Sequence, residues 1–227
     1  MFTSALPPQG QEALELLSST GLLQNFYLAG GTALALHLGH RLSEDLDFFS
    51  PSPVDTLMLK QRLDELDDFQ LLGERWGTLH GIFRGTKVSF LYYRYPLLFP
   101  IATFRGCPVA SPEDIAPMKI EAIASRGSRK DFYDLYFIAR EIADLRQCLE
   151  FYKRKFAGTN FNLYHVLKSL TYFADAEREK EPVLLRRVSW NQAPVLYTRT
   201  GKAPLQPKVF PGIIIELEII FFEAAVL

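Results

Sequence analysis

The stretch that decides the fold is Phe26–Ser50, FYLAGGTALALHLGHRLSEDLDFFS. Its first residues, FYLAGG, have the composition of a short strand that ends at a glycine turn. TALALHLGH then reads as a short helix, with Thr32 available as its N-cap. Polar and apolar residues alternate in the final DLDFFS, which predicts a second strand with Asp45 and Asp47 on one face.

The glycine turn and the two aspartates have chemistry that suits a nucleotide. Carboxylates at positions i and i+2 of a strand lie ~6–7 Å apart on one face and can share divalent cations, which prefer oxygen ligands. A Gly-Gly-Thr turn before a helix offers free N–H groups to a phosphate. Each feature alone is common in proteins that bind no nucleotide. Their joint order along the chain predicts a site for a nucleoside triphosphate with Mg²⁺ bridging its phosphates.

The rest of the chain divides into a first half with helices and strands and a second half that is mostly helical. Helices are expected within residues 7–23 and 50–68, and three strands over 69–76, 78–85 and 87–94 form an antiparallel meander. Four helices are expected in the second half, over residues 111–127, 128–142, 144–156 and 161–176. The predicted fold class is α/β (α+β), a small mixed sheet with flanking helices followed by a helical C-terminal half. The predicted domains are an α/β core over 1–110, a helical part over 111–181 that completes the active cleft, and a tail of uncertain structure over 182–227.

Composition narrows the class of protein. The chain has 227 residues, of which 48% are hydrophobic and 22% charged, and its formal net charge is -1. This net charge gives no general attraction to nucleic acid, so an RNA contact would need a local basic patch. The cluster Lys153–Lys155 is a candidate for that patch, and the alternative is that it is a solvated helix end. Cys107 and Cys148 lie far apart, which predicts neither a disulfide framework nor a zinc site and makes a reducing cytoplasm the expected compartment. The apolar tract at residues 212–227 is too short and too acidic for a membrane span, so no membrane partner is expected.

Two blocks of the sequence resemble a known family. GGTALALHLGHRLSEDLDFF resembles the glycine turn and Asp-x-Asp strand of the AbiEii-type nucleotidyltransferases, which are polymerase-β-like enzymes and toxins of type IV toxin–antitoxin systems. EDIAPMKIEAIASRGSRKDFYDLYFI is similar to that family's second block, and together the blocks cover roughly Phe26 to Arg140.

The resemblance implies a role for particular residues. The expected catalytic residues are Asp45, Asp47, Lys119 and Asp131, and the two aspartates Asp45 and Asp47 are also the expected metal ligands. The expected nucleotide-binding residues are Gly30, Gly31, Thr32, Arg41, Ser43, Arg126, Lys130 and Asp134. For Lys130 the alternative is a solvated surface pair with Asp134, four residues further on.

One position departs from the wider superfamily, in which a third carboxylate on a later strand often activates the attacking hydroxyl. The matching strand here is KVSFLYY, whose polar candidate is Ser89, and no acid lies on it. Either Asp131 or Asp134 replaces this acid, or the enzyme works without one, or the protein is inactive. His80 and His165 have no metal-ligand spacing. His37 and His40 are expected to pack or cap, with a nucleotide contact as the alternative.

The predicted function is transfer of a nucleoside monophosphate from an NTP to a hydroxyl, with one or two Mg²⁺ ions. By resemblance the acceptor is the 3′ end of a tRNA or a protein hydroxyl, and a cognate antitoxin is the protein partner. The alternative is a nucleotide-binding or interaction protein of the same fold without transfer activity. A third possibility is that the turn and the Asp-Leu-Asp only build the sheet.

Overall fold

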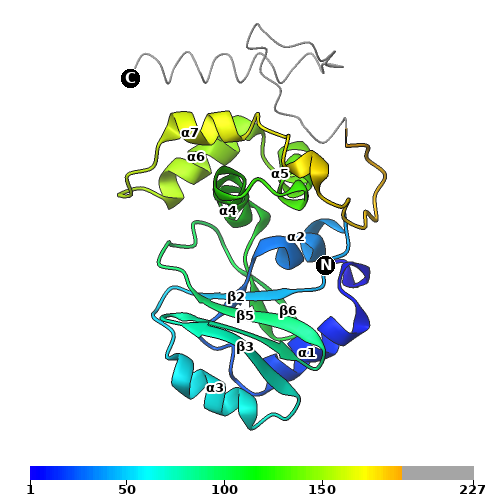
Figure 1. Cartoon of the computed structure of the whole chain (residues 1–227), viewed down its shortest axis with the longest axis vertical. Helices are drawn as coiled ribbons and strands as arrows, with labels where there is room; N and C mark the ends of the chain where they lie inside the picture. The colour runs from blue at the N-terminus through cyan, green and yellow to red at the C-terminus, as the bar shows by residue number, and fades with distance from the viewer. Residues whose placement is uncertain (191–227) are drawn as a thin grey trace, which may run out of the picture. The chain divides into compact units, whose positions relative to one another are not determined.

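The computed structural model describes residues 1–190 of the chain (Figure 1). Its contacts divide the chain into two compact units. The first unit holds Met1–Ile115 together with Val183–Arg186, and the second, within the described residues, holds Ala116–Pro182 and 187–190. Most of the tail expected over 182–227 lies outside the described residues, and the boundary expected after residue 110 stays a prediction.

The first unit contains a mixed sheet of seven strands in the order β3-β4-β5-β2-β1-β7-β6. β2 pairs with β5 and β1 with β7 in parallel, whereas the other neighbours are antiparallel. The expected meander is therefore confirmed in β3, β4 and β5. The strands are β1 Tyr27–Leu28, β2 Leu46–Ser50, β3 Phe69–Arg75, β4 Thr78–Phe83, β5 Thr86–Tyr92, β6 Ala102–Phe104 and β7 Cys107–Val109.

Alternation along β2 gives the sheet one apolar and one polar face. Leu46 and Phe48 are fully buried, whereas Asp47 and Phe49 are half-buried. Phe48 stacks on Phe90 of β5 with ring centroids 5.2 Å apart. Burying one such side chain contributes about 1.5–3 kcal/mol. The apolar residues thereby fix the strand's register, and the register leaves Asp47 on the opposite face.

Helices flank the sheet and make up most of the described part of the second unit. α1 contacts β5 and β7, and α3 contacts β3 and β4 (Figure 1). The α-helices are α1 Pro8–Ser19, α2 Gly30–Leu38, α3 Thr56–Asp64, α4 Pro112–Ser125, α5 Arg129–Glu141, α6 Leu145–Lys155 and α7 Leu163–Ser169. The two 3-10 helices are η1 Thr3–Ala5 and η2 Ala176–Arg178. All the expected helices are present, although α7 ends at Ser169 and not near residue 176.

The start of α2 corrects one expectation. The helix begins at Gly30 with Ala29 as its N-cap, so Thr32 is not the cap. Gly30 has φ +68°, a left-handed conformation that side-chain-bearing residues rarely adopt. This glycine lets the chain turn directly from β1 into the helix, whose N-cap lies three residues earlier than expected. The Thr32 hydroxyl instead forms hydrogen bonds with the loop that precedes β2.

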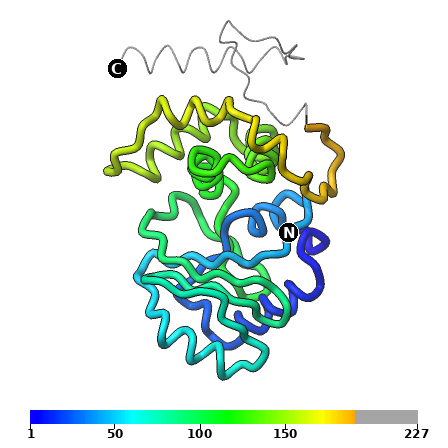
Figure 2. Tube along the Cα trace, viewed as in Figure 1, coloured from blue at the N-terminus to red at the C-terminus, as the bar shows by residue number. Residues whose placement is uncertain are grey.

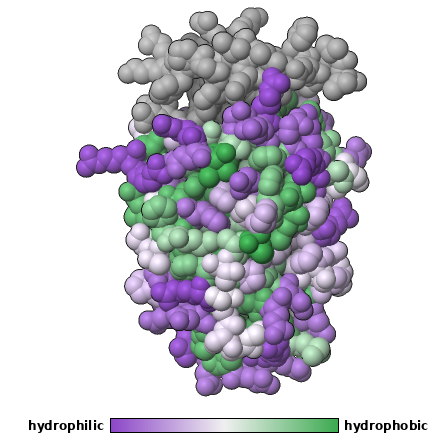
Figure 3. Space-filling model, turned by 180° about the vertical axis from the view of Figure 1, so that it is seen from behind, coloured by the Kyte–Doolittle hydropathy of each residue, from purple (hydrophilic) through white to green (hydrophobic). Residues whose placement is uncertain are grey.

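The described surface is mixed in polarity. Figure 3 shows apolar and polar residues side by side on one face. The exposed large apolar residues include Leu57, Met58, Leu72 and Trp76, and single exposures of this kind are ordinary in folded proteins. Among residues 1–190, no helix is both long and apolar enough to cross a membrane.

Candidate active site

The glycine pair lets two functional side chains approach the start of α2. A Cβ at Gly30 would lie 3.5 Å from Oδ2 of Asp47. A Cβ at Gly31 would collide with the guanidinium of Arg41 and would lie 3.5 Å from Oγ of Ser43. Glycine at residue 31 is therefore required for Arg41 to lie where it does, against the N-terminal end of the helix.

The loop between α2 and β2 is held over that helix end by its own side chains. The Thr32 hydroxyl is hydrogen-bonded to the Ser43 hydroxyl at 2.8 Å and donates to the backbone carbonyl of Asp45. Arg41 is 4% exposed, and its Nη1 donates to the carbonyl of Leu42 at 2.9 Å. The side chains expected to bind phosphate are thus ordered before any ligand arrives, which lowers the entropic cost of binding.

A segment far away in sequence fixes the backbone of the same loop. Leu42 N–H donates to the carbonyl of Val183 at 2.8 Å, and Leu185 N–H donates to the carbonyl of His40 at 2.9 Å. Leu184 forms an isolated antiparallel bridge with Arg41. Figure 2 shows this orange segment beside the blue loop that follows α2. Nothing in the sequence pattern predicted this pairing.

The two aspartates lie at the start of β2. Asp45 directly precedes the strand and Asp47 is its second residue, and both are half-buried. The Asp47 carbonyl accepts a hydrogen bond from Ala29 N–H at 3.1 Å, which ties the strand to the glycine turn. No cluster of three or more metal-binding side chains occurs in the described part of the chain. Mg²⁺ often binds through one or two carboxylates and completes its coordination with water and substrate phosphates, so this donor pair fits that ion.

Ser89 occupies the position next to Asp47 on the neighbouring strand. The parallel register of β2 and β5 pairs Asp47 with Ser89. The side chain opposite Asp47 is therefore a hydroxyl and not a carboxylate.

The second unit contains a buried network of opposite charges. Nζ of Lys119 lies 2.9 Å from Oδ1 of Asp131 and 2.6 Å from Oδ2 of Asp134. Arg126 Nε donates to Oδ2 of Asp131 at 2.8 Å, and the Ser128 hydroxyl donates to the same oxygen at 2.8 Å. Both aspartates are fully buried and Lys119 is 4% exposed. The network joins α4 to the first two turns of α5.

Lys130 does not join this network. Its side chain is exposed, whereas Asp134 is fully buried and bound to Lys119. A solvated Lys130–Asp134 surface pair is therefore wrong. The spacing of four residues suggested that pair, but the amphipathic face of α5 turns Asp134 inward.

The network sets the ionisation of Asp131. Burial alone would raise the pKa of this carboxyl, but the charges of Lys119 and Arg126 outweigh burial and lower the pKa to about 2. The carboxylate form is therefore retained at all ordinary pH values.

We expect this shift to appear as acid sensitivity. Because the folded pKa lies below the unfolded value, Asp131 stabilises the fold above about pH 4 and loses this contribution as the pH falls towards 2. The loss should be on the order of 2 kcal/mol. Urea unfolding at pH 7, 4 and 2 measures it, with Asp131→Asn as the control whose stability should fall less across the last interval. Equal losses in both proteins would contradict the prediction.

The comparison with protein families decides the identity of the chain. The model of the family described as nucleotidyl transferase AbiEii toxin, type IV toxin–antitoxin system, matches residues 12–102 and 92–195. The chain belongs to the AbiEii family. The resemblance of the two sequence blocks is thereby confirmed, and a mixed α/β fold with a nucleotidyl transfer role is established at the level of the family.

Similar proteins include one close relative and more distant solved structures. The relative is the Aquifex aeolicus (strain VF5) protein named uncharacterized protein aq_aa25, which is 42% identical to this chain over 179 residues. The aligned region covers 77% of this chain and 86% of the relative. A candidate nucleotidyltransferase from H. pylori has 16% identity and a TM-score of 0.46, with 94% of this chain and 96% of that chain covered. JHP933 from Helicobacter pylori has 17% identity and a TM-score of 0.46, with 94% of each chain covered.

The predicted site residues of this AbiEii-family chain fall into two groups, one in each unit. The first unit brings together Gly30, Gly31, Thr32, Arg41, Ser43, Asp45 and Asp47 around the start of α2. The second brings together Lys119, Arg126, Asp131 and Asp134. The role of each residue stays a prediction.

The glycine pair gives a direct test of the first group. We expect Gly31→Ala to weaken NTP binding about 5- to 140-fold, because the added Cβ displaces Arg41 and a steric conflict of this kind costs about 1–3 kcal/mol. Gly73→Ala is the matched control, since its added Cβ would meet nothing within 4 Å. Titration of each variant with a fluorescent NTP analogue measures the effect. Unchanged affinity in Gly31→Ala would contradict a role for Arg41 at the helix end.

Other sequence candidates have structural explanations. His37 Nε2 lies 3.0 Å from the carbonyl of Ala110, and burial lowers the pKa of its imidazole. His165 Nε2 lies 3.1 Å from the carbonyl of Ala124. In the Lys153–Lys155 cluster, Lys155 is 1% exposed and Lys153 pairs with Glu150, so the cluster is not a uniform cationic surface.

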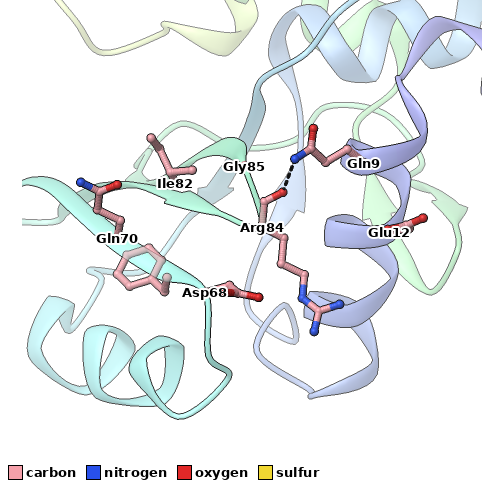
Figure 4. Close-up of a pocket in the computed structure, with 8 residues that line it drawn as sticks. Gln9, Glu12, Asp68, Gln70, Ile82, Arg84 and Gly85 are labelled. Atoms are coloured by element: carbon pink, nitrogen blue, oxygen red, sulfur yellow. Dashed lines mark hydrogen bonds between the residues drawn. The ribbon is translucent and has the colours of Figure 1, made fainter.

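The first unit also has an open pocket of about 740 Å³ that contains none of the predicted site residues (Figure 4). In Figure 4, Gln9 of α1 donates to the carbonyl of Arg84 at 2.7 Å, which closes one side of the pocket. Its lining residues are Gln9, Glu12, Asp68, Phe69, Gln70, Ile82, Arg84 and Gly85. The lining combines acidic, basic and amide groups without the convergent arrangement of a dedicated ligand site.

Proposed function

We propose that this AbiEii-family protein transfers a nucleoside monophosphate from an NTP to an acceptor hydroxyl and releases pyrophosphate. One observation carries the proposal. The N-terminal end of α2, the guanidinium of Arg41 and the carboxylate of Asp47 converge at the glycine pair. In this proposal the helix end would bind phosphate, and the Asp47 carboxylate beside it would bind the cation.

The start of α2 would hold the triphosphate. The helix has no side-chain cap at Ala29, so the first N–H groups, on Gly30, Gly31 and Thr32, are free of side-chain caps. The helix dipole and the Arg41 guanidinium both favour negative charge there. The Ser43 hydroxyl, beside Thr32, would give a further hydrogen bond to a phosphate oxygen.

Asp45 and Asp47 would hold the Mg²⁺ that accompanies the NTP. A bound Mg²⁺ supplies charge neutralisation at the phosphates and lowers the energy of the developing negative charge on the leaving pyrophosphate. The aspartates contribute oxygen ligands in a half-buried position, where their charges are only partly screened by water.

Lys119 and its partners are proposed to assist from the helical unit. Lys119 would bind a nucleotide phosphate, with Asp131, Asp134 and Arg126 fixing its position. The family description supports a toxin whose partner is an antitoxin, and we propose a cytoplasmic tRNA 3′ end or protein hydroxyl as acceptor.

The test is a transfer assay with the full chain. Each α-labelled NTP is incubated with Mg²⁺, total RNA and the protein, beside a matched Asp45→Asn, Asp47→Asn double variant that reveals contaminating polymerase. Label on the RNA or on a protein, lost in the double variant, supports the proposal, and gel separation identifies the acceptor. No transfer with any NTP, from a folded protein offered both RNA and protein acceptors, would refute it.

The second candidate is an NTP-binding protein without transfer activity, and Ser89 favours it. The position opposite Asp47 has no acid to activate a hydroxyl. Saturable NTP binding in the same preparation, with no label transferred, would establish this alternative.

A further inference from the structure

A row of residues crosses four adjacent strands and ends at Asp47. Asp47 of β2 pairs with Ser89 of β5, Ser89 pairs with His80 of β4, and His80 pairs with Gly73 of β3. Directly opposite residues in a sheet point to the same side. His80, Ser89 and Asp47 therefore share one face, with the serine between the other two.

The neighbours of His80 leave its imidazole uncrowded. On one side Gly73 has no side chain, and a Cβ there would meet nothing within 4 Å. On the other side Ser89 has one of the shortest polar side chains. His80 itself is half-buried, and no hydrogen bond or ion pair joins its ring to any residue within 1–190.

The dimensions of the row suit a reacting hydroxyl. Neighbouring strands lie about 4.8 Å apart, so the Cα atoms of Asp47 and His80 are separated by roughly 10 Å. An acceptor oxygen above the short Ser89 side chain would lie between the Asp47 carboxylate and the His80 imidazole.

The other candidate bases are poorly suited. The Ser89 hydroxyl is a weak base at neutral pH, and Asp45 and Asp47 are assigned to the metal. Asp131 has a pKa of about 2 and is held by Lys119, Arg126 and Ser128. A carboxylate with so low a pKa accepts a proton weakly, whereas imidazole is the side chain most often used as a general base.

We propose that His80 is the general base of the transfer reaction, and this role rests on the proposed function. The acceptor hydroxyl oxygen forms a bond to the α-phosphorus while the bond from that phosphorus to the bridging oxygen breaks. Pyrophosphate leaves with the electron pair, and the hydroxyl proton passes to a ring nitrogen of His80 and then to solvent.

The experiment measures transfer and NTP binding separately. His80→Ala should lower the single-turnover transfer rate at least about 100-fold, the usual contribution of a general base, with NTP affinity unchanged. The double variant His80→Ala, Ser89→Asp should regain much of the rate, because it places a carboxylate opposite Asp47. Imidazole added to His80→Ala should also raise the rate. His165→Ala is the control histidine and should transfer at the wild-type rate.

Three outcomes overturn the assignment. Transfer by His80→Ala at the wild-type rate excludes a base at this residue. Loss of NTP binding together with transfer indicates a binding role, and loss of transfer with neither rescue indicates a structural one. A wild-type protein that transfers nothing instead overturns the proposed function itself, so the two failures are distinguishable.

Discussion

Asp47→Asn is expected to lower the rate of nucleotide transfer by about 1,000-fold or more, the size of effect found when a group that acts in the transition state is removed. The amide keeps the shape of the side chain but loses the charge that holds a cation. The substitution should leave the fold intact, because Asp47 is half-buried and its link to Ala29 runs through the backbone carbonyl.

The measurement is the initial rate of label transfer at several Mg²⁺ concentrations, with the midpoint of thermal unfolding recorded for each protein. Glu44→Gln is the matched control, since Glu44 is an exposed acid of the same loop. Its rate should equal that of the wild type. A rate for Asp47→Asn above half that of the wild type would refute metal binding by this residue.

Asp131→Ala is expected to destabilise the protein by about 3–5 kcal/mol, the usual cost of breaking a buried ion pair by removing one partner. Lys119 would keep its charge in a buried position after losing the Asp131 carboxylate, and the Ser128 hydroxyl would lose its acceptor. Arg126 contributes little to this cost, because its side chain is 57% exposed and can turn to water.

Urea unfolding at pH 7 measures this effect as a change in the free energy of unfolding. Lys130→Ala is the control on the adjacent residue, and a change within about 0.5 kcal/mol is expected there because the side chain is exposed. A loss below about 1 kcal/mol for Asp131→Ala would show that the network adds little to stability, since breaking a buried pair normally costs several times more.

Local patterns in the sequence predicted much of the fold. The alternation in DLDFFS fixed which side chains of β2 are buried, because a period of two leaves one choice of face once Leu46 and Phe48 enter the core. The three strands of the meander were separable because glycine turns divide them. β6 and β7 were not predicted, because a strand of three residues is too short to show an alternation of polar and apolar side chains.

The candidate site was predicted in part, and the missing part is tertiary. Helical spacing placed Lys119 and Arg126 on one face of the helix expected over residues 111–127, and Asp131 and Asp134 on one face of α5. It could not show that these faces meet, nor that Asp134 prefers Lys119 to Lys130. His80 was likewise unremarkable in sequence, because its relation to Asp47 arises only from the pairing of β4, β5 and β2.

The pairing of Val183 and Leu185 with the loop at His40 to Leu42 has a consequence for the timing of folding. Ribosomes deliver the N-terminal residues first, so the sheet can form while the helical residues are still being synthesised. The loop that carries Arg41 acquires its last backbone partners only after residue 185 has been made. The nascent chain would therefore complete its proposed phosphate-binding loop late in translation. A shortened product ending before Val183 would contain all seven strands of the sheet but would lack the backbone hydrogen bonds that hold this loop.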